Sequence, residues 1–186
     1  MRLSIVAGAN GSGKTTFALS YATFHSIAFV NADEIAKSLN PDHMEQEKFR
    51  AGKIFLEQIE ELLDHRQELI IETTMSGKYL MKIIQKAKAI GYQIDIFYLY
   101  LADVKDHIAR VQNRVFNGGH SIPKEDIIRR YYRSRQLFFS LYKELADRWF
   151  LFFNADDEFE EVANFADGEL TVLHEPYYHM FTKGLI

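Results

Sequence analysis

Residues 8–15 read Gly-Ala-Asn-Gly-Ser-Gly-Lys-Thr and match the phosphate-binding pattern G-x-x-x-x-G-K-[ST]. A short apolar run, Leu3–Ala7, precedes this motif, and the helix-like sequence Thr16-Phe17-Ala18-Leu19 follows it. A strand, a loop and a helix in this order are the context that the motif requires. The motif therefore predicts an α/β fold in which the first strand leads directly into a phosphate-binding loop.

The chemistry of this loop predicts a nucleotide site. Its glycines let backbone N–H groups turn toward phosphate oxygens at a helix N-terminus, where the helix dipole favours anions. Lys14 would reach the β- and γ-phosphates, and Thr15 would hold Mg²⁺. We therefore expect ATP or GTP to bind with Mg²⁺. The residues predicted to bind the nucleotide are Gly8, Ala9, Asn10, Gly11, Ser12, Gly13, Lys14, Thr15 and Thr16.

The composition is that of a globular protein. The 186 residues are 47% apolar and 26% charged, which is ordinary for one domain. A net charge of −4 disfavours nucleic acid as a partner, because dedicated nucleic-acid binders are usually basic. The absence of cysteine excludes disulfides and thiolate metal sites. No apolar run approaches the roughly 18 residues of a membrane span, and the start lacks a signal-peptide pattern. We expect a cytoplasmic, soluble protein without a membrane partner.

Short apolar runs alternate with helical patterns along most of the chain. The runs are rich in β-branched or aromatic residues, as are strands that are buried on both faces of a parallel sheet. They span residues 3–7, 27–30, 69–72, 94–101 and 149–153. The helical patterns span about 14–24, 46–65, 78–89, 104–116 and 124–146. This alternation predicts right-handed β-α-β units and a mainly parallel central sheet.

The last part of the chain predicts a small β-hairpin. Residues 161–165 and 170–173 flank Asp167-Gly168, a dipeptide typical of tight hairpin turns. No Lys or Arg occurs from Trp149 to Thr182, whereas acids are frequent, and we interpret this stretch as a solvated surface. We expect a single domain over residues 1–186, with its core over about 1–154 and the hairpin and tail over about 155–186.

Carboxylates follow the second and third predicted strands. Asp33 and Glu72 should face the space in front of the loop, because ligands bind at the carboxyl ends of strands in open α/β sheets. Phosphoryl transfer needs an acceptor for the proton of the attacking hydroxyl. Asp33 could be that acceptor, or it could cap a helix, a role for which Asn31 competes. Glu72 could orient the substrate hydroxyl, bind metal-bound water or serve as the base. Thr73 and Thr74 could bind substrate or stabilise a turn.

Basic residues concentrate between residues 107 and 135, where seven Lys and Arg face two acids. These basic residues are Arg110, Arg114, Lys124, Arg129, Arg130, Arg133 and Arg135. Arg110 and Arg114 are four residues apart and should share one helix face. Arginines beside a P-loop suit phosphate clamping, although each could instead be an ordinary solvated charge. His120, in the glycine-containing loop 117–123, could contact substrate or cap a turn.

Several segments together resemble the zeta-toxin family of P-loop kinases. They follow one another in the order of that family and cover roughly residues 2–175. The segments are 7–16, 31–35, 71–77, 91–92, 110–115, 118–120, 122–123 and 130–131. The resemblance implies a three-layer α/β P-loop kinase fold that uses ATP and Mg²⁺. Zeta toxins phosphorylate a sugar hydroxyl of UDP-N-acetylglucosamine, so it also implies a small hydroxyl substrate of the sugar-nucleotide class and an antitoxin protein as a partner.

The resemblance also implies roles for individual residues. Lys14 would be the phosphate lysine, Asp33 the catalytic base, and Arg110 or Arg114 the clamping arginine. Glu72 and Thr74 would face the substrate. We place His120 and Arg130 among the candidate substrate contacts as well.

Two other functions stay open. The protein could be a polynucleotide 5′-kinase whose basic segment binds strand phosphates, but its acidity and the lack of an obvious stacking platform disfavour this. It could also be a nucleotide-dependent binding switch with weak ATPase activity. The presence of both Asp33 and Glu72 disfavours such an inactive site.

Overall fold

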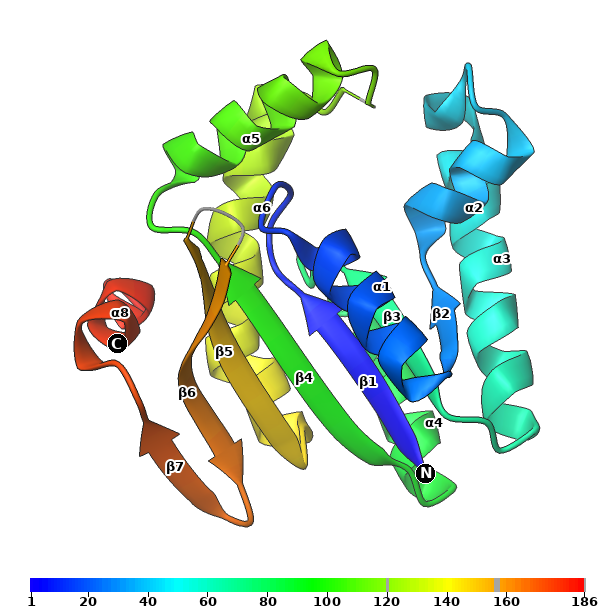
Figure 1. Cartoon of the computed structure of the whole chain (residues 1–186). Coiled ribbons are helices and arrows are strands. Elements are labelled where there is room, and N and C mark those ends of the chain that lie inside the picture. Colours follow the sequence, from blue (N-terminus) through cyan, green and yellow to red (C-terminus); the bar gives the residue numbers. More distant parts are fainter. Residues whose placement is uncertain (120, 156–157, 186) are drawn as a thin grey trace.

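The computed structural model describes residues 1–119, 121–155 and 158–185. Within them, seven strands form one sheet in the order β2-β3-β1-β4-β5-β6-β7 (Figure 1). The strands are β1 (Arg2–Ala7), β2 (Ala28–Val30), β3 (Leu69–Thr73), β4 (Gln93–Tyr100), β5 (Arg148–Ala155), β6 (Glu158–Ala166) and β7 (Glu169–Val172). The helices are α1 (Lys14–His25), α2 (Ala32–Leu39), α3 (Met44–Asp64), α4 (Leu80–Ala89), α5 (Val104–Phe116), α6 (Lys124–Leu137), α7 (Lys143–Leu145) and α8 (Glu175–Thr182).

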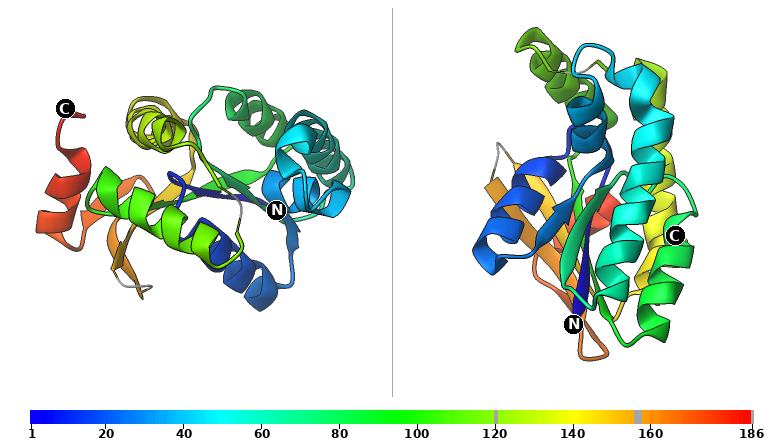
Figure 2. Two further views of the ribbon diagram at one scale, coloured as in Figure 1. Left: turned by 90° about the horizontal axis from the view of Figure 1, so that it is seen from above. Right: turned by 90° about the vertical axis from the view of Figure 1, so that its right-hand side faces the viewer.

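The sheet is mainly parallel, as the alternation of strands and helices predicted. Strands β2, β3, β1, β4 and β5 run parallel, and β6 and β7 continue the same sheet in antiparallel pairs. Helices cover both faces, so the protein has three layers (Figure 2). The five strands predicted for the central sheet agree with β1 to β5 within two residues at either end, whereas β6 starts three residues before the predicted hairpin strand 161–165. The prediction of a three-layer α/β fold with a mainly parallel central sheet is confirmed.

The two faces of the sheet have separate apolar cores. The larger core joins buried residues of β1, β3 and β4 to α3, α4 and the helices that follow α6. The smaller core lies under α1, where Phe17 packs between Phe97, Phe152 and Phe159 at ring-centroid distances of 5.3–5.4 Å. Because β1 and β3 are buried on both sides, apolar residues dominate them without alternation.

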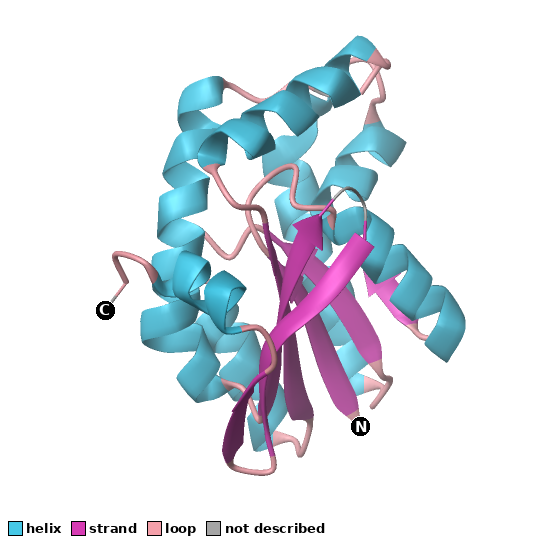
Figure 3. Cartoon of the chain, turned by 60° about the vertical axis from the view of Figure 1, so that its left-hand side comes forward, coloured by secondary structure: helices cyan, strands magenta, loops and turns pink. Residues whose placement is uncertain are grey.

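The predicted hairpin forms, and it extends the sheet. Asp167 and Gly168 have φ values of +55° and +81°, the left-handed conformations that a tight hairpin turn uses. Strand β6 pairs with β5 on one side and with β7 on the other. Helix α8, which the sequence did not predict, follows the hairpin near the C-terminus (Figure 3). It buries Phe181 against Tyr98 and Phe138.

The helix predicted over residues 124–146 is interrupted. Helix α6 ends at Leu137, a π-helical turn spans Phe138–Tyr142, and α7 completes the segment. A π turn accommodates one extra residue within a helix. The hydroxyl of Tyr142 donates a hydrogen bond of 2.6 Å to the carbonyl of Gly77, which lies in the loop after β3. No helix within the described residues is both long and apolar enough to span a membrane.

Candidate functional site

The phosphate-binding loop joins β1 to α1 in a conformation that only glycine allows at several positions. Gly8, Gly11 and Gly13 have φ values of +141°, +83° and +90°. A Cβ atom on Gly8 would lie 2.1 Å from the carbonyl oxygen of Leu99, and one on Gly13 would lie 2.4 Å from the amide nitrogen of Asn154. That nitrogen donates to the carbonyl of Ser12 at 3.0 Å. Both the left-handed backbone and the close packing therefore require these glycines.

A cavity of about 920 Å³ lies in front of the loop. It sits near the carboxyl end of β1, where connections leave toward opposite sides of the sheet, the usual ligand site of open α/β folds. Its charged lining comprises Lys14, Lys48, Arg110, Arg114, Arg129 and Arg130 against Asp33 and Glu72. This excess of positive charge, in a chain of net charge −4, suits a polyphosphate ligand.

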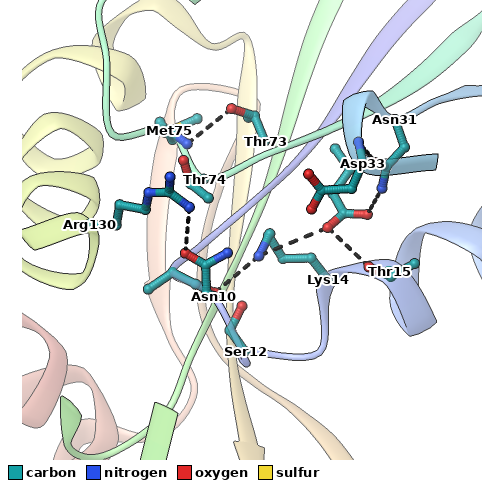
Figure 4. A network of polar contacts seen from close by, with 12 residues as sticks. Asn10, Ser12, Lys14, Thr15, Asn31, Asp33, Thr73, Thr74, Met75 and Arg130 are labelled. Atoms are coloured by element: carbon teal, nitrogen blue, oxygen red, sulfur yellow. Dashed lines mark hydrogen bonds and ion pairs between the residues drawn. The ribbon is translucent and has the colours of Figure 1, made fainter. Parts of the chain in front are cut away.

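Glu72 of β3 connects the loop to Asn31, the residue that follows β2. Figure 4 labels its partners Lys14, Thr15 and Asn31. Its Oε1 accepts a hydrogen bond of 3.1 Å from the Thr15 hydroxyl and lies 3.9 Å from Nζ of Lys14, and its Oε2 accepts a bond from the Asn31 amide. Lys14 also donates to the carbonyl of Ala9 at 3.0 Å. Burial raises the pKa of Glu72, an effect that the Lys14 charge opposes, and burial lowers the pKa of Lys14. Glu72 is thus engaged by the loop and by Asn31.

Asp33 occupies a different environment from Glu72. The side chain of Asn31 caps α2 by accepting from the backbone N–H groups of Asp33 at 2.7 Å and Glu34 at 3.1 Å. Asn31 is therefore the cap, and Asp33 is not. The Asp33 side chain is exposed, lines the cavity and makes no hydrogen bond to the described residues. Its carboxylate is accordingly accessible to a ligand in the cavity.

Some basic residues of the segment 107–135 line the cavity, and others lie elsewhere in the fold. Arg110 and Arg114 line the cavity from one face of α5, as their spacing predicted, and Arg129 and Arg130 line it from α6. Arg135 is instead buried beneath α8, where its guanidinium donates to backbone carbonyls. Lys124 and Arg133 are exposed outside the lining, and His120 lies outside the described residues.

Hydroxyl groups from the end of β3 and the segment that follows it line another wall of the cavity. The hydroxyls of Thr73 and Tyr79 are 2.8 Å apart, and those of Thr74 and Ser76 are 2.9 Å apart. The backbone N–H of Met75, at φ +51°, donates to the Thr73 hydroxyl at 3.0 Å, which bends the loop sharply. This wall can form hydrogen bonds with a polar ligand, and it includes the predicted contact residue Thr74.

Sequence reasoning missed several residues of the lining. Lys48 enters from α3, where nothing local distinguishes it from other surface lysines. Ser76 and Tyr79 could have been found, because they continue the run of hydroxyl residues that begins at Thr73 and Thr74 beyond a strand end.

His107 of α5 packs against the loop. Its Nδ1 lies 2.8 Å from the carbonyl oxygen of Asn10 and must donate to it, because a carbonyl only accepts. The ring is 1% exposed, and burial lowers the pKa of His107 to about 4. A Cβ on Gly11 would lie 2.8 Å from the His107 carbonyl, so the helix backbone and the loop are in direct contact.

Replacing His107 with Gln should reduce the acid sensitivity of the protein. The ordinary histidine pKa of 6.5 falls to about 4 in the folded chain, so between these values the unfolded chain binds a proton that the folded chain excludes. Stability is therefore lost as the pH falls. By about pH 5 the contribution of His107 should be a loss of about 2 kcal/mol. Urea unfolding at about pH 7 and about pH 5 should show a smaller drop for His107→Gln. Equal drops in the two proteins would contradict this.

A family model described as AAA domain matches residues 3–137. A relative from Haemophilus influenzae (strain ATCC 51907 / DSM 11121 / KW20 / Rd), described as an uncharacterized protein, is 29% identical over 128 residues, which cover 67% of this chain and 88% of the relative.

Solved structures share the fold. The AvrRxo1-ORF1:-ORF2 complex with ATP is 18% identical, with a TM-score of 0.76 over 97% of this chain; our chain spans 63% of the length of that chain. The PezAT toxin–antitoxin system of Streptococcus pneumoniae is 17% identical, with a TM-score of 0.66 over 98% of this chain and 79% of that one. A chain of the Pnkp1/Rnl/Hen1 RNA repair complex is 26% identical, with a TM-score of 0.61 over 76% of this chain and 45% of that one. The protein is therefore a P-loop nucleotide-binding protein of kinase-like fold that belongs to the AAA domain family.

Proposed function

We propose that the protein is an ATP-dependent phosphotransferase that moves the γ-phosphate of ATP to a hydroxyl group of a small metabolite. The observation that carries this proposal is the placement of Asp33. Its carboxylate lines the same cavity as Lys14 and the arginines of α5 and α6, and it makes no hydrogen bond to the described residues. Phosphate transfer requires a proton acceptor next to such cations, whereas a nucleotide-dependent switch does not.

In this reaction the acceptor oxygen attacks the γ-phosphorus, and the bond from that phosphorus to the bridging oxygen of ADP breaks. The proton of the acceptor hydroxyl passes to Asp33. Lys14 and the backbone N–H groups of the loop bind the β- and γ-phosphates, and Arg110 and Arg114 stabilise the charge on the transferred group. ADP carries the leaving electron pair, so the reaction needs no further reactant.

The residues around Thr15 fit Mg²⁺. The Thr15 hydroxyl donates a hydrogen bond to Glu72, so the lone pairs of its oxygen remain available to a cation. Mg²⁺ prefers oxygen ligands and keeps several of its waters, which could donate hydrogen bonds to Glu72. When bound, Mg²⁺ would neutralise charge on the phosphates. The hydroxyl of Ser12 is also buried in the loop, without a partner among the described residues, which fits a site completed by its ligand.

For the acceptor we propose a sugar nucleotide such as UDP-N-acetylglucosamine. The hydroxyl-lined wall at Thr74 and Ser76, with Lys48 and Arg129 in the same cavity, supports a polar and anionic substrate. The resemblance to zeta toxins and the fold shared with the PezAT toxin–antitoxin system support a toxin role with an antitoxin partner in the cytoplasm.

Transfer of label from γ-labelled ATP tests the proposal. The protein is incubated with Mg²⁺ and a panel of metabolites that includes UDP-N-acetylglucosamine, and the labelled products are separated. Label on a metabolite, with an equal amount of ADP, is the expected result. Release of inorganic phosphate at a rate that no metabolite changes would contradict transfer and favour a switch.

A second candidate function is polynucleotide 5′-phosphorylation, favoured by the similarity to a chain of an RNA repair complex. The same assay therefore includes a 5′-hydroxyl oligonucleotide. Label on this oligonucleotide, lost steeply as salt increases, would favour that function over the metabolite kinase.

A further inference from the structure

Asn10, in the middle of the phosphate-binding loop, is held by both arginine-bearing helices. Its backbone carbonyl accepts from Nδ1 of His107 on α5 at 2.8 Å. Its side-chain Oδ1 accepts from Nη1 of Arg130 on α6 at 3.1 Å. The residue is only 6% exposed, and yet it belongs to the lining of the cavity. Its backbone is therefore held by α5 and its side chain by α6.

The contact with Arg130 determines which way the Asn10 amide faces. A guanidinium group donates hydrogen bonds and cannot accept them, so the amide atom that faces Arg130 must be the oxygen. The NH₂ group then faces the other way. Figure 4 shows this nitrogen turned away from Arg130 and toward the side of Lys14. Two oriented N–H bonds are thus directed to the part of the cavity next to the phosphate lysine.

Arg130 is itself oriented. Its Nη2 lies 3.6 Å from a carboxylate oxygen of Asp126, one helical turn earlier on α6, and its side chain is 23% exposed. The sequence predicted Arg130 as a substrate contact, whereas here one of its donors is committed to Asn10. The chain of contacts runs from Asp126 through Arg130 to the amide of Asn10.

We propose that the Asn10 side chain binds the polyphosphate of the nucleotide through its NH₂ group, and that Arg130 is a positioning residue that fixes the direction of this donor. The inference rests on the proposed function, because it requires a nucleoside triphosphate in the cavity. A neutral amide at this point gives two donors without the desolvation cost of another buried charge.

Asn10→Asp is the sharpest test, because it keeps the shape of the side chain and its contact with Arg130. It replaces the NH₂ donor with a carboxylate oxygen that repels phosphate. The Kd of ATP·Mg²⁺, measured by calorimetry, should rise by about a hundredfold, and by about tenfold for Asn10→Ala, which loses the donor alone. Thermal unfolding without nucleotide shows whether each variant folds. Arg133→Leu, an exposed site on the same helix and outside the cavity, is the matched control and should bind like the wild type.

A double-mutant cycle tests the positioning role. Arg130→Leu should weaken ATP binding by several fold, and the Asn10→Ala/Arg130→Leu variant should bind no more weakly than Asn10→Ala, because Arg130 acts through the amide. Arg130→Lys, which still donates, should recover part of the affinity. Full additivity of the two losses would overturn the positioning role.

The outcomes separate this inference from the proposed function. If the wild type binds and transfers phosphate while Asn10→Asp binds ATP equally well, the inference is wrong and the proposed function stands. If the wild type does not bind ATP·Mg²⁺, both are wrong.

Discussion

Asp33→Asn should lower the kcat of phosphate transfer by about a hundredfold or more and leave the affinity for ATP·Mg²⁺ within about twofold. The amide has the shape of the carboxylate but cannot take the proton of the acceptor hydroxyl. Affinity should persist because Asp33 makes no hydrogen bond to the P-loop, and the Asn31 cap of α2 uses backbone groups that the substitution leaves in place. Steady-state rates with the labelled acceptor, together with calorimetric ATP binding, give both quantities.

Glu34→Gln is the matched control, because Glu34 is exposed, adjacent on α2 and outside the cavity lining. It should keep the wild-type kcat. An Asp33→Asn protein with unchanged kcat would remove Asp33 as the base and leave Glu72, the other carboxylate of the lining, as the candidate. A parallel loss of ATP affinity and kcat would instead indicate that Asp33 contributes to binding of the nucleotide.

Lys14→Met should abolish measurable transfer, with a loss of about a thousandfold, because the P-loop loses its direct cationic contact to the transferred phosphate. The same change should alter the pH dependence of stability. Lys14 opposes the burial that raises the pKa of Glu72, so without Lys14 that pKa should rise further. A carboxyl with a raised pKa in the folded state binds a proton more readily there, and its contribution to stability falls as the pH rises. Lys14→Met should therefore lose more stability than the wild type between about pH 5 and about pH 7.

The Lys14→Met/Glu72→Gln variant separates these effects. The substituted amide would keep an oxygen for the Thr15 hydroxyl but would not titrate, so the added pH dependence should disappear while transfer stays abolished. Urea unfolding at the two pH values measures the first effect, and the label assay measures the second. If the added pH dependence persists in the double variant, Glu72 is not its source.

Local patterns were sufficient to predict the strands and the hairpin turn. Buried parallel strands must be apolar on both faces, and the Asp167-Gly168 turn requires residues that tolerate positive φ, so both leave marks in short windows of sequence. No comparable local pattern predicted helix α8. It has eight residues and is stabilised by packing of Phe181 and by the buried Arg135 from a distant helix. The π turn likewise depends on tertiary packing.

The candidate site likewise has one part that the sequence predicts and another that depends on tertiary packing. The phosphate-binding loop could be predicted because its backbone requires glycine at fixed positions. The contact between Asn10 and Arg130 joins residues 120 positions apart, and that between Asn10 and His107 joins residues 97 apart. Such contacts depend on how α5 and α6 pack on the loop. Composition identified the basic segment, but it could not separate Arg130, at the cavity, from Arg135, in the core.

The π turn at Phe138–Tyr142 makes the position of the hydroxyl-lined wall depend on helical phase. One extra residue shifts the following side chains by about 100° around the axis relative to an unbroken α-helix. In that phase Tyr142 reaches the Gly77 carbonyl and anchors the loop that carries Thr74 and Ser76. The position of the hydroxyl-lined wall thus depends partly on the number of residues in the π turn that follows α6. A one-residue deletion in this turn would move Tyr142 away from the Gly77 carbonyl, and so would shift that wall without changing any residue that lines the cavity.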